Sequence, residues 1–385
     1  MKNYTKKIFI FGILFILSIF CCFAELLNSP TWGYSVDLPE EFVLVDKSGT
    51  DSYMFENQFV STSVILKAYK KEKFSSSLEA IETVMSQLNA TYECAESDWR
   101  NTDCIIAQFA FNLGNESNSG WAVSSLLPKS KGYVVMLCYT PSDLFADLEQ
   151  FVISCVDSLC IDYGSYYHPG PITSFAFPKG ENQDYTIQID GKNINITLDS
   201  NDFEADQFVV EREYAVLTLY QGSEMWVEAW QRYYRQVYKN AYSRLDKAAF
   251  NIYNSLIRSC KSENSDLELV RKLLSWVQTF DYARDFTSTD FTPITKNIVG
   301  FGSDCDSRAM LLACLLHHMN YDTCLFVSAE FSHALFGIVL DSKGAKIPVG
   351  NRNFLLGETT APVDIGLVPS NMNQTDKWIF VELNQ

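Results

Sequence analysis

Positive charge is scarce in this sequence. Its 385 residues hold 30 lysines and arginines against 47 aspartates and glutamates, which gives a formal net charge of −17. No run of five or more basic residues appears after the start of the chain. Nucleic-acid binding depends on clustered Lys and Arg that contact phosphates. We therefore expect no nucleic-acid partner.

Long apolar runs are also missing beyond the first 24 residues, because no later segment approaches the ~18 apolar residues that span a bilayer. The start differs, with the basic "MKNYTKK", the apolar "IFIFGILFILSIFCCF" and a small-x-small pattern that ends at Ala24. This order is typical of a secretory signal peptide. We expect residues 1–24 to be removed and the protein to be exported, periplasmic or surface-held, without a membrane span. Cys21 and Cys22 leave a lipid anchor open, although the bulky Phe20 fits it poorly.

Histidine is scarce, whereas cysteine is not. Nine cysteines follow the signal segment, and an odd number in an exported protein leaves at least one thiol unpaired. Two short-range pairings could close small disulfide loops, Cys94 with Cys104 and Cys155 with Cys160, but spacing does not determine pairing. The four histidines are His168, His317, His318 and His333.

The length and the 47% hydrophobic content favour two or three globular domains. We expect an α+β sandwich over residues 25–163, a Gly- and Pro-rich linker over 164–174, and a second α+β domain with a helical lead-in over 175–385. The stretches "GYSVDLPEEF" and "FVISCVDSL" resemble the PsbP-like family, named after an extrinsic protein of photosystem II. That resemblance implies a binding or scaffold module without chemistry of its own.

Aromatic residues recur every fourth position after the linker. First comes "YTIQIDGKNINITLD", which predicts a hairpin with Asp-Gly at its turn. Residues 224–257 are expected to form one long helix, and their aromatic side chains form a slowly drifting stripe. Packing against a domain is the ordinary interpretation, and a carbohydrate- or peptide-binding stripe is the alternative. The stripe comprises Trp226, Trp230, Tyr234, Tyr238 and Tyr242.

The stretch "GSDCDSRAMLLACLLHH" places a thiol between two carboxylates at the start of an apolar run. Ser303 or Asp304 is a suitable N-cap, and the run that follows is apolar on every face, which predicts a buried helix. Cys305 would then lie in the first turn, where free N–H groups and the helix dipole favour a thiolate. Asp304 and Asp306 oppose this, because nearby negative charge raises a thiol pKa. The thiol therefore needs a cationic partner.

His333 is the histidine best placed to be that partner. His168 falls in the linker, and His317 and His318 lie about 18 to 20 Å further along the same helix as Cys305. His333 opens the strand "HALFGIVLD" and can reach a helix start. The next strand, "RNFLLGETT", presents Glu358, whose carboxylate could hold the second ring nitrogen.

Two other acids compete with Glu358 for the imidazole. Asp341 lies at the far end of the histidine's own strand, about 26 Å away, and is excluded by distance. Asp364, which follows the "TAP" segment that ends the strand, remains a possible partner of the imidazole.

The order of these motifs resembles the transglutaminase-like superfamily, which covers transglutaminases, peptide:N-glycanases and bacterial transglutaminase-like cysteine proteinases. The resemblance rests on "SDCDSRAMLLACLL", "HALFGIVLD" and "FLLGETTAPVDIG", within residues 267–365. It implies a papain-like α+β domain with Cys305 as nucleophile, His333 as general base and acid, and Glu358 as orienting acid. The chain departs from the family in having Glu358 where Asp often precedes a Thr, and Ser303 where a Gly is common.

The chemistry that this implies is attack of a thiolate on a carboxamide or peptide carbonyl, with a thioester intermediate. Protease, deamidase and transamidase outcomes remain open, and the expected partner is a protein or peptide substrate. The sequence does not identify a second hydrogen-bond donor for the oxyanion. Trp276 and Gln278 lie upstream at a plausible helix end, but their ordinary interpretation is a core and a surface residue. A catalytically inactive, peptide-binding module of the cell envelope is the alternative function.

No cofactor and no metal are expected. Cys314 and His318 share a helix face and could hold zinc with Cys324 or His317. Both cysteines are embedded in leucines, so the ordinary interpretation is inert packing.

Overall fold

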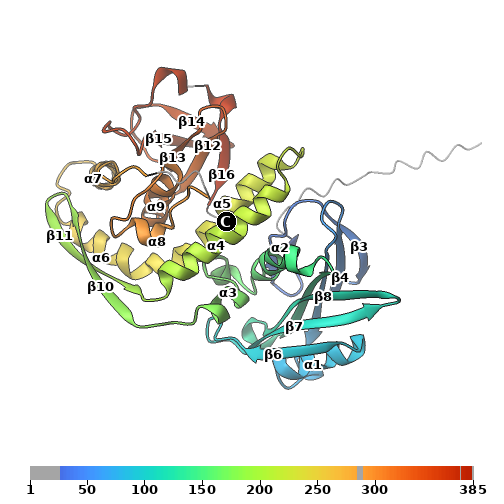
Figure 1. The fold of residues 1–385 in the computed structure, drawn as a ribbon. Coiled ribbons are helices and arrows are strands. Elements are labelled where there is room, and N and C mark those ends of the chain that lie inside the picture. Colours follow the sequence, from blue (N-terminus) through green and yellow to red (C-terminus); the bar gives the residue numbers. More distant parts are fainter. Residues whose placement is uncertain (1–26, 284–288, 373, 384–385) are drawn as a thin grey trace, which may run out of the picture.

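Two antiparallel sheets, one from each end of the chain, lie on either side of a group of helices (Figure 1). The computed structural model describes residues 27–283, 289–372 and 374–383, so the expected signal segment lies outside the described residues. The chain is thus a mixed α and β protein, as predicted. No helix in these described ranges is long and apolar enough to cross a membrane.

The first sheet has seven strands and is covered by a helix on each face. After the short pair β1 (Leu27–Asn28) and β2 (Ser35–Val36) comes the sheet order β3-β4-β5-β9-β8-β7-β6. Its strands are β3 (Phe42–Ser48), β4 (Ser52–Asn57), β5 (Ser63–Lys70), β6 (Thr91–Glu96), β7 (Cys104–Leu113), β8 (Glu116–Leu126) and β9 (Gly132–Pro141). The covering helices are α1 (Ser77–Leu88) and α2 (Phe145–Asp157).

Strand alternation explains how one sheet supports two cores. On β7, Ile105 belongs to the core under α1, whereas Ile106 belongs to the core under α2. Successive side chains of a strand point to opposite faces, so each strand contributes to both cores. The central strand β9 is consequently buried along nearly its whole length.

Residues 164–174, the segment expected to be a linker, have helical structure and buried side chains. They lie in a 3₁₀ helix over Tyr163–Tyr167 and in α3 (Pro171–Ala176), and several are buried. The reason is the carboxylate of Asp157, which accepts hydrogen bonds from the backbone N–H groups of Ile172 (2.7 Å) and Thr173 (3.1 Å). This contact holds the segment against the end of α2.

A hairpin and a series of helices follow. The hairpin consists of β10 (Asn182–Ile189) and β11 (Lys192–Asp199), and Asp190 and Gly191 both have positive φ at its turn, which confirms the prediction. The expected single aromatic helix is divided by a 3₁₀ turn at Ser243–Leu245. The helices are α4 (Asp202–Leu219), α5 (Trp226–Tyr242), α6 (Asp246–Ile257), α7 (Ser265–Val277) and α8 (Ile294–Asn297).

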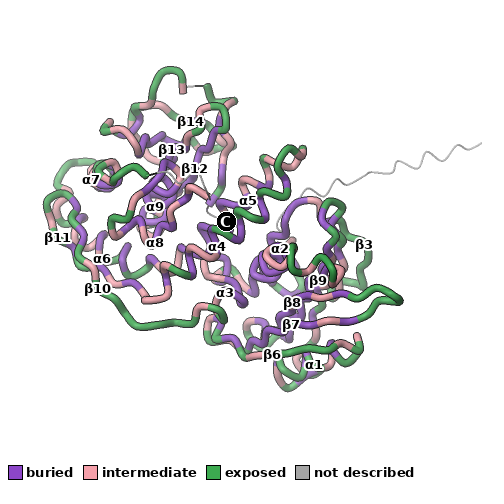
Figure 2. The backbone as a smooth tube through the Cα atoms, viewed as in Figure 1, coloured by how far each residue is buried: buried purple, intermediate pink, exposed green. Residues whose placement is uncertain are grey.

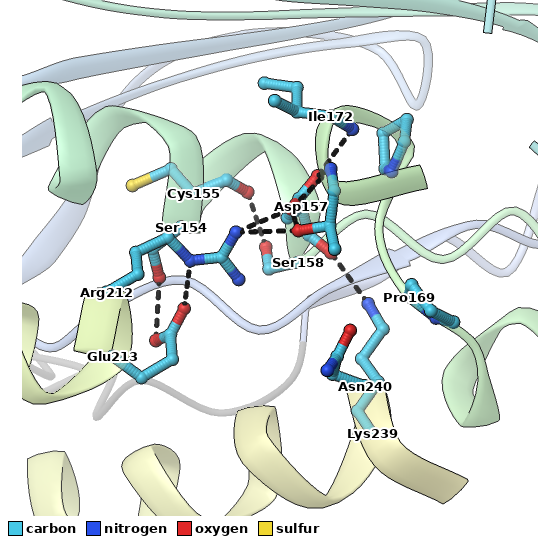
Figure 3. Close-up of polar contacts among 12 residues, drawn as sticks. Ser154, Cys155, Asp157, Ser158, Pro169, Ile172, Arg212, Glu213, Lys239 and Asn240 are labelled. Carbon is cyan, nitrogen blue, oxygen red and sulfur yellow. Dashed lines mark hydrogen bonds and ion pairs between the residues drawn. The ribbon is translucent and has the colours of Figure 1, made fainter. Parts of the chain in front are cut away.

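Buried charges join the first sheet unit to these helices (Figure 3). Arg212 on α4 donates from Nη1 to Asp157 of α2 (2.6 Å) and from Nε to Glu213 (2.8 Å). Glu213 also accepts from Arg232 on α5 (2.9 Å) and from Ser154 on α2 (2.9 Å). All four charged side chains are at most 3% exposed.

A second contact ties the segment after β2 to α5. The carboxylate of Asp37 accepts hydrogen bonds from Arg235 (2.9 and 3.1 Å) and from Gln236 (2.8 Å), while Arg232 donates to its backbone carbonyl. Because buried charges need partners, the first unit and α5 hold each other in a defined orientation.

The second sheet carries the helix that begins at Cys305. Its strand order is β14-β15-β13-β12-β16, and α9 (Cys305–His318) packs on β12 and β13. Figure 2 shows α9 buried along most of its length, as its apolar sequence predicted. The strands are β12 (Thr323–Ser328), β13 (His333–Val339), β14 (Lys346–Val349), β15 (Arg352–Gly357) and β16 (Ile379–Glu382).

All nine described cysteines are free thiols. Neither suggested short-range disulfide is present. Cys94 on β6 lies opposite Ala107 rather than Cys104, and Cys160 pairs through its backbone with Ser35.

Candidate functional site

Cys305 is the first residue of α9. Asp304 is the N-cap: its Oδ1 accepts from the Ser307 backbone N–H (2.7 Å), and the Ser307 hydroxyl in turn accepts from the Asp304 N–H (3.1 Å). The first N–H groups of a helix have no partner within it. The thiol thus lies beside the backbone N–H groups of the first turn, at the positive end of the helix dipole.

His333 and Glu358 are in direct contact. The imidazole Nε2 lies 2.7 Å from Glu358 Oε2, and the other carboxylate oxygen accepts from the N–H (2.7 Å) and hydroxyl (2.6 Å) of Thr360. Glu358 follows β15, which pairs with the strand that His333 opens, so the sheet brings the two together. Nδ1 is therefore the ring nitrogen left for the thiol.

The thiol itself is directed at a carboxylate. Cys305 Sγ donates to Asp306 Oδ1 (3.2 Å), and the backbone N–H of Ala334 donates to the sulfur. Ala334 follows His333 directly, so the thiol lies next to the start of β13. Within the described part of the chain, no hydrogen bond joins the sulfur to the imidazole.

Burial and two negative charges act against ionisation of this thiol. Burial raises the pKa of the Cys305 thiol, and the charges of Asp306 and Asp304 raise it further, above its usual range. The Ala334 N–H opposes them weakly. Burial likewise raises the pKa of Asp306, against hydrogen bonds from Tyr234 and from the thiol. The acid beside the histidine behaves oppositely: hydrogen bonds from His333 and Thr360 outweigh burial and hold the pKa of Glu358 below its usual value.

A cavity of about 300 Å³ gives access to this group of residues. Cys305 and His333 both line it, although Cys305 is only 5% exposed. Acids and aromatic rings from four segments complete the wall, which includes Trp226, Trp230, Tyr233, Tyr234, Asp290 and Phe291.

The aromatic stripe of the lead-in helix is split between two roles. Trp226, Trp230 and Tyr234 line the cavity, with successive ring centroids 6.2 Å apart. The Tyr234 hydroxyl donates to Asp306 Oδ2 (2.5 Å), which ties α5 to the first turn of α9. Tyr238 and Tyr242 instead pack against His317 and His318.

Two residues beside the site hold neighbouring segments in place through hydrogen bonds. The sequence did not predict these contacts. Arg308, one turn after Cys305, is 1% exposed and donates to the Ser303 hydroxyl (2.7 Å) and to the Phe280 carbonyl (2.6 Å). Gln278 donates to the carbonyls of Glu358 (2.8 Å) and Val363 (2.9 Å). The side-chain amide of Gln278 thus supports the loop that carries the acid.

The other candidates lie elsewhere. Asp364 forms an exposed ion pair with Arg271 (2.6 Å) and is not the acid on His333. Among the described residues, no three His, Cys, Asp or Glu side chains are grouped so that they could hold a metal ion. Cys314 is fully buried, and the His318 ring contacts the Tyr242 carbonyl (3.0 Å), so both have structural surroundings.

Comparisons with known proteins identify no family. No family model matches the chain, and no curated protein matches it. Solved structures that align with it include the Ran-binding protein Mog1p of Saccharomyces cerevisiae (12% identity, TM-score 0.28, 36% of this chain and 96% of that one). Others are the cyanobacterial PsbP protein of Synechocystis (11%, 0.29, 37% and 95%) and a Bacteroides thetaiotaomicron protein (12%, 0.25, 88% and 88%). At these TM-scores the likenesses carry no argument about fold or function.

Proposed function

We propose that the chain is an exported cysteine acyl transferase or hydrolase of the transglutaminase-like type. The observation that supports this most directly is the arrangement of three groups, two of which line one cavity. A thiol lies at a helix start, a histidine opens the adjacent strand, and a buried carboxylate is 2.7 Å from the far nitrogen of that histidine. Nucleophile, base and orienting acid are the parts that covalent acyl transfer needs.

The reaction begins with a movement of the thiol. A rotation about χ1 of Cys305 takes the sulfur from Asp306 toward Nδ1 of His333, which accepts the proton. Glu358 stabilises the imidazolium that results and keeps the ring in place. The thiolate then attacks the carbonyl carbon of a carboxamide or peptide bond.

Release of the amine completes the first half of the reaction. The backbone N–H of Cys305 donates to the oxyanion of the tetrahedral intermediate, because the first N–H groups of a helix are unpaired. The imidazolium returns its proton to the leaving amine, and a thioester remains on Cys305. Water or a second amine then attacks the thioester, which gives hydrolysis, deamidation or transamidation.

One observation favours a second candidate, a non-catalytic protein-binding module of the cell envelope. The thiol donates to Asp306, and burial and the neighbouring acids raise its pKa. Such a thiol is a poor nucleophile unless something in the complex lowers that pKa. The aromatic lining of the cavity would serve peptide binding without chemistry.

Comparison of Cys305→Ala with the unaltered protein tests both candidates. Each protein is incubated with cell-envelope proteins from the organism that produces it. Mass spectrometry then records deamidated glutamines, new peptide termini and amide cross-links. We expect these products with the unaltered protein and with Cys94→Ala, which removes an exposed thiol on β6, and none with Cys305→Ala. Products that persist in Cys305→Ala would exclude the enzyme. A protein that forms no product but captures the same peptides with and without Cys305 would be the binding module.

A further inference from the structure

The cavity beside Cys305 contains a regular row of aromatic rings on one helix. The rings belong to Trp226, Trp230 and Tyr234, which follow one another every fourth residue of α5 and all line the cavity. Their centroids are 6.2 Å apart at both steps. This spacing is that of the helix itself, because four residues advance it by about 6 Å along its axis. The row therefore has a fixed period and a fixed direction.

One end of the row lies at the thiol. The Tyr234 hydroxyl donates to Asp306 Oδ2 (2.5 Å), and Asp306 Oδ1 accepts from Cys305 Sγ (3.2 Å). Tyr234 is buried, whereas Trp230 and Trp226 are each half-buried. The row thus runs from a partly exposed end of the cavity to the candidate nucleophile.

The two tryptophans of the row also carry free hydrogen-bond donors. Four of the seven tryptophans donate their indole N–H to another residue of the chain: Trp32, Trp99, Trp121 and Trp378. The indole N–H groups of Trp226 and Trp230 have no acceptor among the described residues. Because an enclosed indole N–H usually has a partner, a ligand that covers these rings should supply acceptors, and the carbonyls of a peptide are acceptors of this kind.

We propose that this row binds the substrate as an extended peptide, in which apolar side chains two residues apart lie on successive rings of α5. The inference rests on the proposed function, which places the reacting residue of the peptide at Cys305, and it specifies the class of substrate. An extended chain advances about 3.3 Å per residue, and alternate side chains point to the same face. Side chains two residues apart are therefore about 6.6 Å apart, close to the 6.2 Å between the rings.

Other peptide conformations fit the row less well. In polyproline II the same face recurs only every third residue, about 9.3 Å along the chain. A helix has a suitable repeat of about 6 Å at every fourth residue, but it is about 10 Å wide and its carbonyls are held in its own hydrogen bonds. It would thus be too wide for a cavity of about 300 Å³ and would present no free carbonyl to Cys305.

Binding of labelled peptides to Cys305→Ala tests the inference, because this variant can bind a peptide but cannot react with it. Each peptide is a short Ser and Gly chain with a central Gln and two Phe residues on one side of that Gln. The two Phe residues are one, two or three positions apart, so composition and charge are the same throughout. One set has them before the Gln and a second set has them after it, which covers both chain directions. Fluorescence anisotropy gives each dissociation constant.

We expect a spacing of two positions to bind about tenfold to hundredfold more tightly than one or three, in at least one chain direction. Only this spacing puts both Phe rings on α5, and burial of one aromatic side chain changes a dissociation constant by about this factor. Trp230→Ala should remove the preference, whereas Trp230→Phe, which retains a ring, should keep most of it. Phe250→Ala removes an exposed ring of α6 outside the cavity and should change nothing. Far-UV circular dichroism checks the fold of each variant.

Equal affinities at all three spacings, a preference that persists in Trp230→Ala, or tightest binding at three positions, as a helical ligand would give, would overturn the inference. Binding of a hexasaccharide of N-acetylglucosamine where no peptide binds would also overturn it and make the row a carbohydrate site. These results would leave the acyl-transfer proposal standing, because the products formed with and without Cys305 decide it. A spacing preference in a protein that forms no products would support the inference and assign the row to the binding module.

Discussion

Replacement of one buried arginine, Arg212, should lower the free energy of unfolding of the whole protein. Arg212 lies between Asp157 and Glu213, and Arg232 also donates to Glu213. Arg212→Leu removes the ion-pair partner of Asp157 and one of the two guanidiniums on Glu213, in a site whose charged side chains are at most 3% exposed. The ammonium of Lys239 stays, but it contacts the backbone carbonyl of Asp157 and not the carboxylate. Removal of one partner from a buried ion pair costs about 3–5 kcal/mol. We expect the free energy of unfolding to fall by about that amount.

Arg271→Leu is the matched control. Both arginines lie inside helices, and Leu and Arg have nearly equal helix propensity. Arg271 pairs with Asp364, but the two side chains are 49% and 44% exposed. Exposed pairs contribute about 0–1 kcal/mol. The difference between the two variants thus isolates the effect of burial.

Urea unfolding monitored by two probes provides the measurement. Far-UV circular dichroism reports the helices, and the fluorescence of the seven tryptophans reports both sheets and the helices between them, for example through Trp99 before β7 and Trp276 in α7. Because the ion network joins α2 to α4 and α5, both probes should shift together in Arg212→Leu. Adding Asp157→Asn should recover part of the loss, since the uncompensated charge is then removed. A loss below about 1 kcal/mol, or a shift confined to one probe, would refute this account of the network.

Three further predictions concern the candidate site. Glu358→Gln should lower kcat by about 10² to 10⁴, with little change in KM, because the ring of His333 loses its orientation and its charge partner; an unchanged kcat would remove Glu358 from the mechanism. The same carboxylate should make stability pH-dependent: its pKa is lowered in the folded state, so its contribution is present above about pH 4.3 and is lost as pH falls through the lowered value. Urea titrations should then show a smaller acid loss in Glu358→Gln than in the unaltered protein. Asp306→Asn should lower the pKa of the Cys305 thiol, since one neighbouring negative charge is removed; the pH dependence of iodoacetamide alkylation measures this, and an unshifted curve would contradict it.

Features governed by neighbouring residues were predictable from the sequence. The Asp-Gly pair at 190–191 predicts the turn of the hairpin, because both positions require positive φ. Asp304 is a natural cap for an apolar helix, and the structure has it in that role. Such features are predictable because capping depends on contacts within one turn.

Features that depend on distant contacts were not predictable. Helix α4 was missed because its buried face carries Asp206, Arg212 and Glu213, so the sequence lacks the apolar stripe of an amphipathic helix. These charges become compatible with burial only beside α2 and α5, which are remote in sequence. The pairing of Asp37 with Arg235, 198 residues apart, is of the same kind.

The two aspartates around Cys305 have structural duties that explain why they flank a thiol. Asp304 caps α9, and Asp306 accepts from Tyr234 and so attaches α5, with its aromatic residues, to the mouth of the helix. Each duty requires an acceptor, and each introduces a charge that raises the pKa of the thiol. A neutral acceptor would perform either duty without this effect on the nucleophile. The reactivity of the thiol should therefore depend on these two acids, and the shift expected in Asp306→Asn measures how much of the raised pKa comes from one of them.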